Sequence, residues 1–292
     1  MAVEVAPSLR VIRHESEHDR WELVFGNPDP RLRAYVVHYC AYDEETSTFT
    51  RRIEAPALRA PLIFNFGPPI AVCAPRAEVS DWRLLDDGLV AGLYDTYALV
   101  ESSGSQSGVE VYLTPVGARL VLGMPMRHLK GQVITLDECF GALAGLVREQ
   151  LLEAASWDER FSIVDSFLLP RVAAAEPPPP SLTWALSRLH ATNGVVDIGS
   201  LTDELRCSRR YLIGLFNDHV GLPPKLYARI LRFRHALELA GGYDGMGWAE
   251  IAHRSGYYDQ AHMVRDFQQF TGHSPTDYQR LTLPDSGGVV GD

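Results

Sequence analysis

The sequence predicts an α+β protein of two domains, a β-rich first domain and an all-helical second domain with two helix-turn-helix units. Three observations predict this class. The first half holds short segments rich in Val, Ile, Tyr and Phe between turn sequences, which is typical of strands. The segment Ala173–Pro180 ends in four successive prolines, which interrupt helices and sheets. After it, apolar residues recur at steps of three and four, the period of an amphipathic helix.

The first domain, residues 1–172, is predicted to form a sandwich or small barrel. Turn sequences such as Gly67-Pro68-Pro69 and Asp86-Asp87-Gly88 separate its strand candidates. The Ser/Gly run Ser102–Gly108 is predicted to be a flexible loop and not a phosphate cradle, because no Lys and no helix start follow it. The strand candidates are Leu32–Tyr42, Leu62–Phe66, Leu89–Leu93, Val109–Leu113 and Gln132–Leu136.

Two amphipathic helices, at about residues 137–171, are expected to close this domain as a helical arm. Ser156 and Glu159 have the spacing of a capping box that opens the second helix. The arm would pack on the β domain, pair with a second copy of the chain, or do both. Its apolar stripes consist of Phe140, Leu143, Val147 and Leu151 in the first helix and Phe161, Val164 and Leu168 in the second.

The prolines of Ala173–Pro180 predict an extended, semi-rigid spacer between the domains. We place the helical domain at residues 181–283 and a disordered tail at 284–292. Asn193-Gly194 ends the first helix of this domain, whose apolar face consists of Leu182, Ala185, Leu186 and Leu189.

The first helix-turn-helix unit is predicted to begin at Leu201. Leu201–Leu205 forms its first helix and Arg206-Cys207 its turn, and Ser208 caps the second helix, Arg209–Asp218. The predicted core residues of that second helix are Tyr211, Leu212, Leu215 and Phe216.

The second unit runs from Trp248 to Phe270. Ala252 is small where the two helices approach, and Gly256 suits the left-handed backbone of a tight turn. Asp259 caps the helix Gln260–Phe270. Met263, Phe267 and Phe270 face the core of this unit, and the outer face consists of Gln260, Ala261, Val264, Arg265 and Gln268.

A long helix is predicted between the units, starting at Pro223-Pro224. With about eighteen residues it would be near 27 Å long, close to the ~34 Å between successive major-groove faces of DNA. The two recognition helices would then enter adjacent turns on one side of a duplex. Its core positions are Leu226, Ile230, Phe233 and Leu237, with Lys225, Arg229, Arg232 and Arg234 mostly elsewhere.

The charge distribution permits a nucleic-acid partner. The formal net charge is −10, but residues up to Pro180 hold 16 Lys and Arg against 25 Asp and Glu. Residues Ser181–Leu281 hold 11 against 10. The acidity therefore belongs to the first domain, and the second domain is neutral with arginines grouped locally.

Five stretches of the second domain match a known family pattern: SRRYLIGLF at 208–216, GLPPK at 221–225, AEIA at 249–252, GYYDQAHMVRDF at 256–267 and TGHSPTDY at 271–278. With them, residues 201–281 resemble the DNA-binding domain of the AraC/XylS family of regulators. The family's layout implies a β-rich, cupin-like barrel that senses a ligand or dimerises. The segments Leu62–Gly67, Gly92–Asp95 and Leu113–Ala118 also resemble the N-terminal domain of one branch of that family.

This sequence departs from the family pattern mainly in the first unit. Arg206 and Thr202 stand where Gly and a small Ala are usual. Ile213 and Gly214 lie on the outer face of the first recognition helix, where the family often has polar base-reading residues. Either the backbone there comes very near a phosphate, or the first unit positions the protein more than it reads sequence.

The residue types predict how each candidate would meet DNA. Gln pairs with adenine and Arg with guanine or phosphate, so Gln260 and Arg265 are expected to carry more discrimination than anything in the first unit. Arg209 and Arg210 would contact phosphates or purines. His262 is expected to read a base, meet a phosphate or pack beside its helix. The remaining DNA-binding candidates are Ala261, Val264, Gln268, Ile213 and Lys225.

The sequence gives no sign of catalysis, a cofactor or a metal. The four cysteines, more than thirty residues apart, are expected to be reduced and mostly buried. His38 and His128 lack the H-x-H pattern of metal-binding cupins, and no nucleophile elbow or nucleotide-binding glycine motif is present. No apolar run predicts a membrane span or secretory signal, so we expect a cytoplasmic protein.

Three functions are compatible with these features. The leading interpretation is a transcription regulator whose partners are a double-stranded operator, a small-molecule effector, a second copy of the chain and RNA polymerase. The second is a ligand-independent DNA-binding protein whose β domain only dimerises. The third is an enzyme or DNA-repair protein with an appended DNA-binding module, which the scattered cysteines do not favour.

Overall fold

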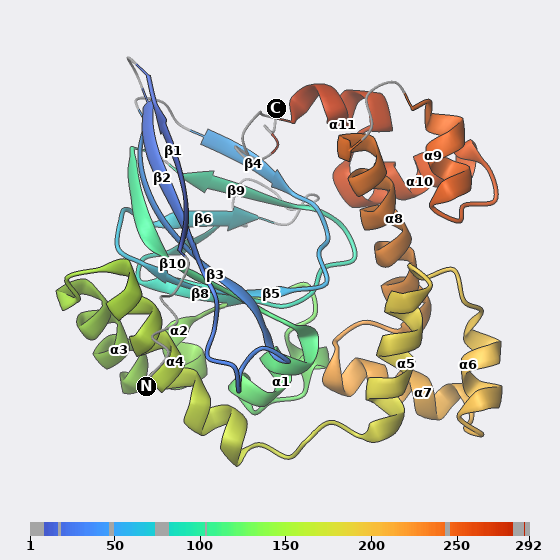
Figure 1. Cartoon of the computed structure of the whole chain (residues 1–292), viewed down its shortest axis with the longest axis horizontal. Helices are drawn as coiled ribbons and strands as arrows, with labels where there is room; N and C mark the ends of the chain where they lie inside the picture. Colours follow the sequence, from blue (N-terminus) through green and yellow to red (C-terminus); the bar gives the residue numbers. More distant parts are fainter. Residues whose placement is uncertain are drawn as a thin grey trace, which may run out of the picture.

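The computed structural model describes residues 9–16, 19–46, 50–73, 82–102, 104–242, 246–282 and 289. The chain forms a two-sheet β domain with helices on one face, followed by an all-helical domain beside it (Figure 1). The predicted α+β class is therefore confirmed. The predicted tail, 284–292, lies outside the described residues except for Val289.

The β domain contains two antiparallel sheets. The larger has the order β1-β2-β3-β10-β5-β8-β11 and the smaller the order β4-β9-β6-β7. The strands are β1 (Arg10–Glu15), β2 (Asp19–Gly26), β3 (Val36–Thr46), β4 (Thr50–Glu54), β5 (Ala60–Asn65), β6 (Ile70–Cys73), β7 (Arg83–Leu85), β8 (Gly88–Ala91), β9 (Ala98–Ser102), β10 (Ser105–Leu113) and β11 (Val133–Thr135).

The five predicted strand segments correspond to β3, β5, β8, β10 and β11. The prediction of a flexible loop at Ser102–Gly108 is wrong, because β9 ends at Ser102 and β10 already begins at Ser105. From there β10 pairs with β3, Ser105 opposite Glu45. Cross-strand pairing thus outweighs the low strand propensity of Ser and Gly.

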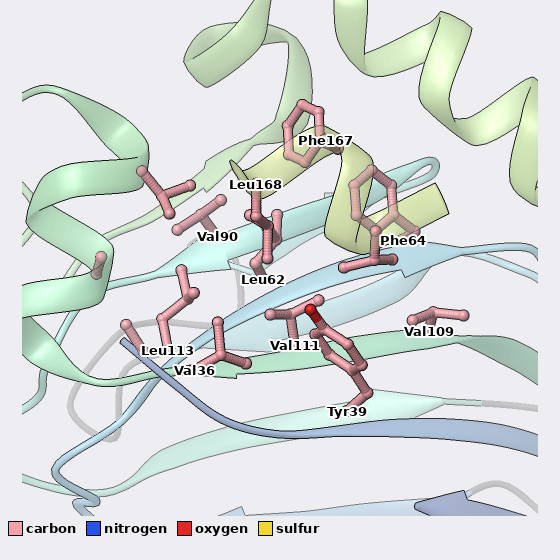
Figure 2. Packing of buried hydrophobic residues seen from close by; sticks show 14 of the residues in the cluster. Val36, Tyr39, Leu62, Phe64, Val90, Val109, Val111, Leu113, Phe167 and Leu168 are labelled. Carbon is pink, nitrogen blue, oxygen red and sulfur yellow. The ribbon is translucent and has the colours of Figure 1, made fainter. Parts of the chain in front are cut away.

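One face of the larger sheet carries the main core of this domain. Tyr39, Leu62, Phe64 and Val111 pack there against Phe167 and other residues of the helical arm (Figure 2). The Tyr39 hydroxyl also donates a 2.6 Å hydrogen bond to Asp165 of the arm. The predicted packing of the arm on the β domain is confirmed. Its helices are α2 (Leu136–Phe140), α3 (Ala142–Glu153) and α4 (Trp157–Ala174), after α1 (Pro115–Leu122) and the short 3₁₀ helix η2 (Met126–His128).

The predicted capping box of the arm is only half formed. The Ser156 side chain accepts from the Glu159 backbone N–H at 3.2 Å, but the Glu159 carboxylate accepts from the N–H of Ala155 at 2.8 Å instead of that of Ser156. A complete capping box occurs two helices earlier, at the start of α2, between Thr135 and Glu138.

The opposite face of the larger sheet looks toward the smaller sheet and is polar at one end. Arg52 of β4 donates to Glu44 of β3 at 3.1 Å, which links the two sheets. The Arg59 guanidinium lies 4.0 Å from the ring centre of Tyr112, which hydrogen-bonds Glu110. Burial, opposed by that hydrogen bond, raises the pKa of Glu110 to about 7. The other end of this space is apolar, with Ile70, Val72, Leu85, Leu89, Ala91, Ala98 and Val133.

The spacer between the domains is shorter than predicted. Helix α4 continues to Ala174 and Pro180 is already the first residue of α5, so only residues 175–179 are extended. Pro fits the first helical position because the N–H it lacks has no acceptor there. The helical domain contains α5 (Pro180–Ala191), α6 (Ile198–Glu204), α7 (Arg209–His219), α8 (Pro224–Gly242), α9 (Trp248–Arg254), α10 (Gln260–Thr271) and α11 (Pro275–Leu281).

The two domains share an apolar core. Ile53 and Leu93 of the β domain belong to the same buried cluster as Phe216, Phe233 and Phe267 of the helical domain. Polar contacts accompany this packing: Arg127 pairs with Asp218, Thr96 donates to the carbonyl of Gln269 at 2.9 Å, and the Gln269 side chain donates to the carbonyl of Asp95 at 3.1 Å. Within the described residues, no helix has the length and apolar character needed to span a membrane.

Candidate nucleic-acid interface

The turn of the first helix-turn-helix unit is closed by a backbone hydrogen bond and by one side-chain cap. The Cys207 N–H donates to the Thr202 carbonyl at 3.0 Å, and Arg206 takes a left-handed φ of 50°. Thr202 is buried, and its hydroxyl donates to the Gly199 carbonyl at 2.7 Å, so the threonine is satisfied where an alanine is usual. The Ser208 side chain accepts from the Tyr211 N–H at 3.1 Å, which confirms the predicted cap of α7.

The outer face of α7 is exposed. Arg209 and Arg210 in the first turn are exposed, and the Arg209 guanidinium lies beside Gly199 at the start of α6. Ile213 is 42% exposed and Gly214 is open to solvent. Cations at a helix N-terminus oppose the helix dipole, which makes a ligand with negative charge a natural neighbour for these arginines.

The prediction that Tyr211 belongs to the core is wrong, whereas the neighbouring core assignments hold. Leu212 and Phe216 are fully buried and Leu215 is half-buried. Tyr211 is 51% exposed because it lies one residue before Leu212, off the side of α7 that meets the domain core. It lines an open surface pocket with Ser208, Arg210, Gly214, Leu215, Asp218 and His219.

The second unit depends on the predicted glycine. Gly256 has a φ of 78°, and a side chain there would place its Cβ 2.3 Å from Cγ2 of Val195. Ala252 is buried, and its carbonyl accepts from the Tyr257 N–H at 2.9 Å. The Asp259 side chain accepts from the His262 N–H at 2.7 Å, so this predicted cap is also confirmed.

The two faces of α10 differ as the sequence predicts. Met263, Phe267 and Phe270 are fully buried. On the outer side, His262 and Val264 are half-buried, and the His262 ring meets Tyr257 edge-on at 5.2 Å. Exposed side chains form the rest of that face: Gln260, Ala261, Arg265 and Gln268.

A buried ion pair fixes α10 to α8, and sequence reasoning did not find it. Arg229, which we expected away from the core, donates to Asp266 from Nη2 at 2.6 Å and from Nε at 3.2 Å, and to Gln269 at 2.8 Å. The Asp266 side chain is only 2% exposed. The sequence signal available was the position of Asp266 directly before the core residue Phe267, which places an acidic side chain near the buried face of α10. Lys225, in contrast, is exposed.

Tyr258 is a further exposed residue that the sequence reasoning passed over. It lies in the turn before the cap of α10 and is 93% exposed. The adjacent Tyr257 is buried, so two successive tyrosines take opposite roles. A phenol held in the open beside a recognition helix suits a contact with the sugar-phosphate backbone.

One of the two metal candidates of the β domain, His38, packs among aromatic rings. His38 lies between the rings of Phe25 and Tyr112, with centroids 5.8 and 4.7 Å away, and burial lowers its pKa. His128 ends η2, ninety residues along the chain from His38. Among the described residues, no group of three or more His, Cys, Asp or Glu has the arrangement of a metal site.

Two family models match this chain. A helix-turn-helix domain matches residues 201–281, and a domain of unknown function, DUF6597, matches residues 26–135. No curated protein matches the sequence. The C-terminal part of the chain is thus an AraC-type helix-turn-helix domain, and the resemblance found in the sequence is confirmed.

Solved structures with low sequence identity resemble the chain. An apo variant of ToxT from Vibrio cholerae is 12% identical, with a TM-score of 0.46, over 82% of this chain and 96% of ToxT. ToxT with a bound unsaturated fatty acid is 11% identical, with a TM-score of 0.46, over 96% of this chain and 100% of ToxT. The oxalate decarboxylase of Lactobacillus farciminis is 13% identical, with a TM-score of 0.23, over 36% of this chain and 31% of the enzyme.

Proposed function

We propose that this chain is a sequence-specific, DNA-binding transcription regulator of AraC/XylS type that acts without catalysis. The observation that carries the proposal is the pair of capped, outward-facing recognition helices, α7 and α10, at opposite ends of α8 (Figure 1). Their exposed faces hold Arg209 and Arg210 in one helix and Gln260 and Arg265 in the other.

The length of α8 supports binding to two successive major grooves. Helix α8 has 19 residues. At 1.5 Å per residue it is about 28 Å long, near the ~34 Å repeat of the duplex. The Arg229–Asp266 ion pair holds α10 on this strut, and Phe216 of α7 lies in one buried cluster with Phe233 of α8, so both recognition helices are attached to α8. One monomer would therefore cover about two turns of DNA.

Within this interface we assign base reading mainly to α10. Gln260 and Arg265 offer a bidentate amide and a guanidinium, which suit adenine and guanine edges. Arg209, Arg210 and Lys225 would neutralise phosphates, with His262 at the edge of the interface. The exposed Ala261, the half-buried Val264 and Gln268 complete the contact face of α10.

Operator selection followed by substitution tests the assignment. Duplexes selected from a random pool would be titrated with Gln260→Ala, Arg265→Ala and Arg209→Ala variants. We expect the first two to lose preference at individual base pairs by about 1–3 kcal/mol. Arg209→Ala should weaken binding to all sequences alike and lower the salt slope by about one.

Arg31→Ala serves as the control for loss of a positive charge, because Arg31 pairs with Asp29 in the β domain. It should leave DNA affinity unchanged. Unaltered base preference in Gln260→Ala would refute the assignment to α10. Failure of the wild-type protein to bind duplex DNA at low ionic strength would refute the whole proposal.

Control by a small molecule is the finer part of the proposal. The polar end of the space between the sheets, with Arg59, Glu110 and Tyr112, offers donors and acceptors to such an effector. A thermal-shift screen of wild type against Glu110→Gln checks this, since a compound bound there should stabilise only the wild type. If the β domain only dimerises, the screen should find no compound that stabilises the wild type selectively. Light scattering should then show a stable dimer.

The remaining partners follow from the regulator proposal. A second copy of the chain would place two DNA-binding domains on one operator, and RNA polymerase would be the contact for an activator. Such a protein would act in the cytoplasm, where bacterial-type chromosomes lie. Mapping of bound sites across the genome then identifies the genes it controls.

A further inference from the structure

The two recognition helices expose different chemistry to the same proposed partner. On α7 the side chain exposed after the first turn is the branched apolar Ile213, and the next position, Gly214, has no side chain. On α10 the most exposed positions include Gln260, Arg265 and Gln268. Beyond Arg209, Arg210 and Tyr211 of its first turn, α7 therefore exposes few groups that can form hydrogen bonds with base edges.

Ile213 shares a face with the cations of its helix. It follows Arg210 by three residues and Arg209 by four, which places all three on one side of α7. None of the three is buried against the protein. An arginine on a phosphate would thus bring Ile213 into the groove beside it.

Gly214 lets the helix backbone come close to its partner at this point. An ideal Cβ at Gly214 would meet no atom within 4 Å, so nothing in the protein requires a glycine there. Glycine inside a helix costs about 1 kcal/mol relative to alanine. A close approach of something outside the chain explains why that cost is accepted.

The major groove offers few apolar features, and the C5-methyl group of thymine is the clearest of them. We propose that the first recognition helix reads thymine through this methyl group, with Ile213 in van der Waals contact with it and Gly214 permitting the approach. This inference rests on the proposed DNA-binding function and adds a recognition rule to it. It gives the first unit a sequence preference that needs no hydrogen bond.

Methyl deletion in the DNA tests the contact directly. In operators selected from a random pool, the half-site of α10 is identified as the one whose base preference changes in Gln260→Ala. The half-site of α7 is then the neighbouring one, about one helical turn away. Each thymine is then replaced singly by deoxyuridine, which removes only the methyl. We expect one or two replacements in the α7 half-site to weaken binding about three- to five-fold, as for burial of one methyl-sized group.

Protein variants assign the methyl to its side chain. In Ile213→Ala the same deoxyuridine replacements should not change the affinity. In Ile213→Val they should still cause most of the loss seen with the wild type. Ala favours helices more than Ile does, and Ile213 is exposed, so Ile213→Ala should stay folded. Val264→Ala is the matched control, because Val264 is the corresponding β-branched residue on α10. It should leave the α7 half-site's response to deoxyuridine intact.

The outcomes separate this inference from the proposed function. Specific binding with equal affinity for thymine and deoxyuridine operators overturns the inference and leaves the regulator proposal standing. A deoxyuridine effect that persists in Ile213→Ala also overturns it, because another side chain then contacts the methyl. Absence of any duplex binding removes both.

Discussion

The two helix-turn-helix units share a plan but obtain their geometry differently. In the second unit the turn residue is Gly256, whose left-handed φ and contact with Val195 leave no room for a side chain. In the first unit the turn residue is Arg206, which takes a left-handed φ with its side chain exposed to solvent. The comparison shows that glycine is indispensable only where a strained backbone and a close neighbour coincide.

The units also differ in how their recognition helices are held. An ion pair at 2.6 Å joins α10 to α8, with its carboxylate almost fully buried. Helix α7 is held by apolar packing and by the exposed Arg127–Asp218 pair, which joins it to the β domain. Both units also contact the domain that we propose to sense an effector: the first through the Arg127–Asp218 ion pair, and the second through the hydrogen bonds of Gln269 with Asp95 and Thr96.

The largest expected effect concerns the buried ion pair. Asp266→Ala leaves Arg229 without its carboxylate and should lower the free energy of unfolding by about 3–5 kcal/mol, as for other broken buried pairs. Chemical denaturation measures this. The exposed Asp203 of α6 supplies the control, and Asp203→Ala should change stability by less than about 0.5 kcal/mol. Equal losses in both variants would remove the contrast between the units.

Opposite signs are expected at the two turns. Gly256→Ala adds a strained left-handed residue and a contact with Val195, so it should cost about 2 kcal/mol or more. Arg206→Gly relieves strain of the same kind and should be neutral or stabilising by up to about 1 kcal/mol. Urea denaturation measures the free energy of unfolding of both variants. A lower value for Arg206→Gly than for the wild type would contradict the proposed difference between the two turns.

A smaller effect is expected from pH. Burial lowers the pKa of His219 at the end of α7, despite the nearby Asp218 carboxylate. The unfolded chain then binds more protons than the folded chain, so stability is lost as pH falls below about 6.5. The rate of amide hydrogen exchange in α7, corrected for intrinsic rates, should rise as the pH is lowered from 7.5 to 5.5. His219→Gln should abolish that increase, and an unchanged wild-type α7 would contradict the prediction.

Local rules were enough for much of the helical domain. The caps Ser208 and Asp259 and the turn residue Gly256 follow from spacing alone, because each acts within three or four residues. The exposed face of α10 follows from its period, although the contacts it makes with DNA stay a prediction. The Arg229–Asp266 pair joins residues 37 positions apart, and no local pattern identifies such a partner.

The β domain was harder to predict for the same reason. Strand β1, Arg10–Glu15, is short, charged and largely exposed, and it forms because β2 pairs with it. Helix α1 was missed although Thr114 caps it and Pro115 opens it, because its apolar residues resemble a continuation of β10. Pairing and burial between distant segments, rather than propensity, decide such elements.

The apolar cluster that joins Ile53 and Leu93 to Phe216 and Phe267 couples the unfolding of the two domains. Each domain contributes residues to this shared core. Cleavage of the chain within residues 175–179 would therefore expose apolar surface on both fragments. Heating should accordingly melt the two halves together in a single calorimetric peak. A chimaera that takes its helical domain from another such protein would also need the residues of the β domain that pack against it, at the positions of Ile53 and Leu93.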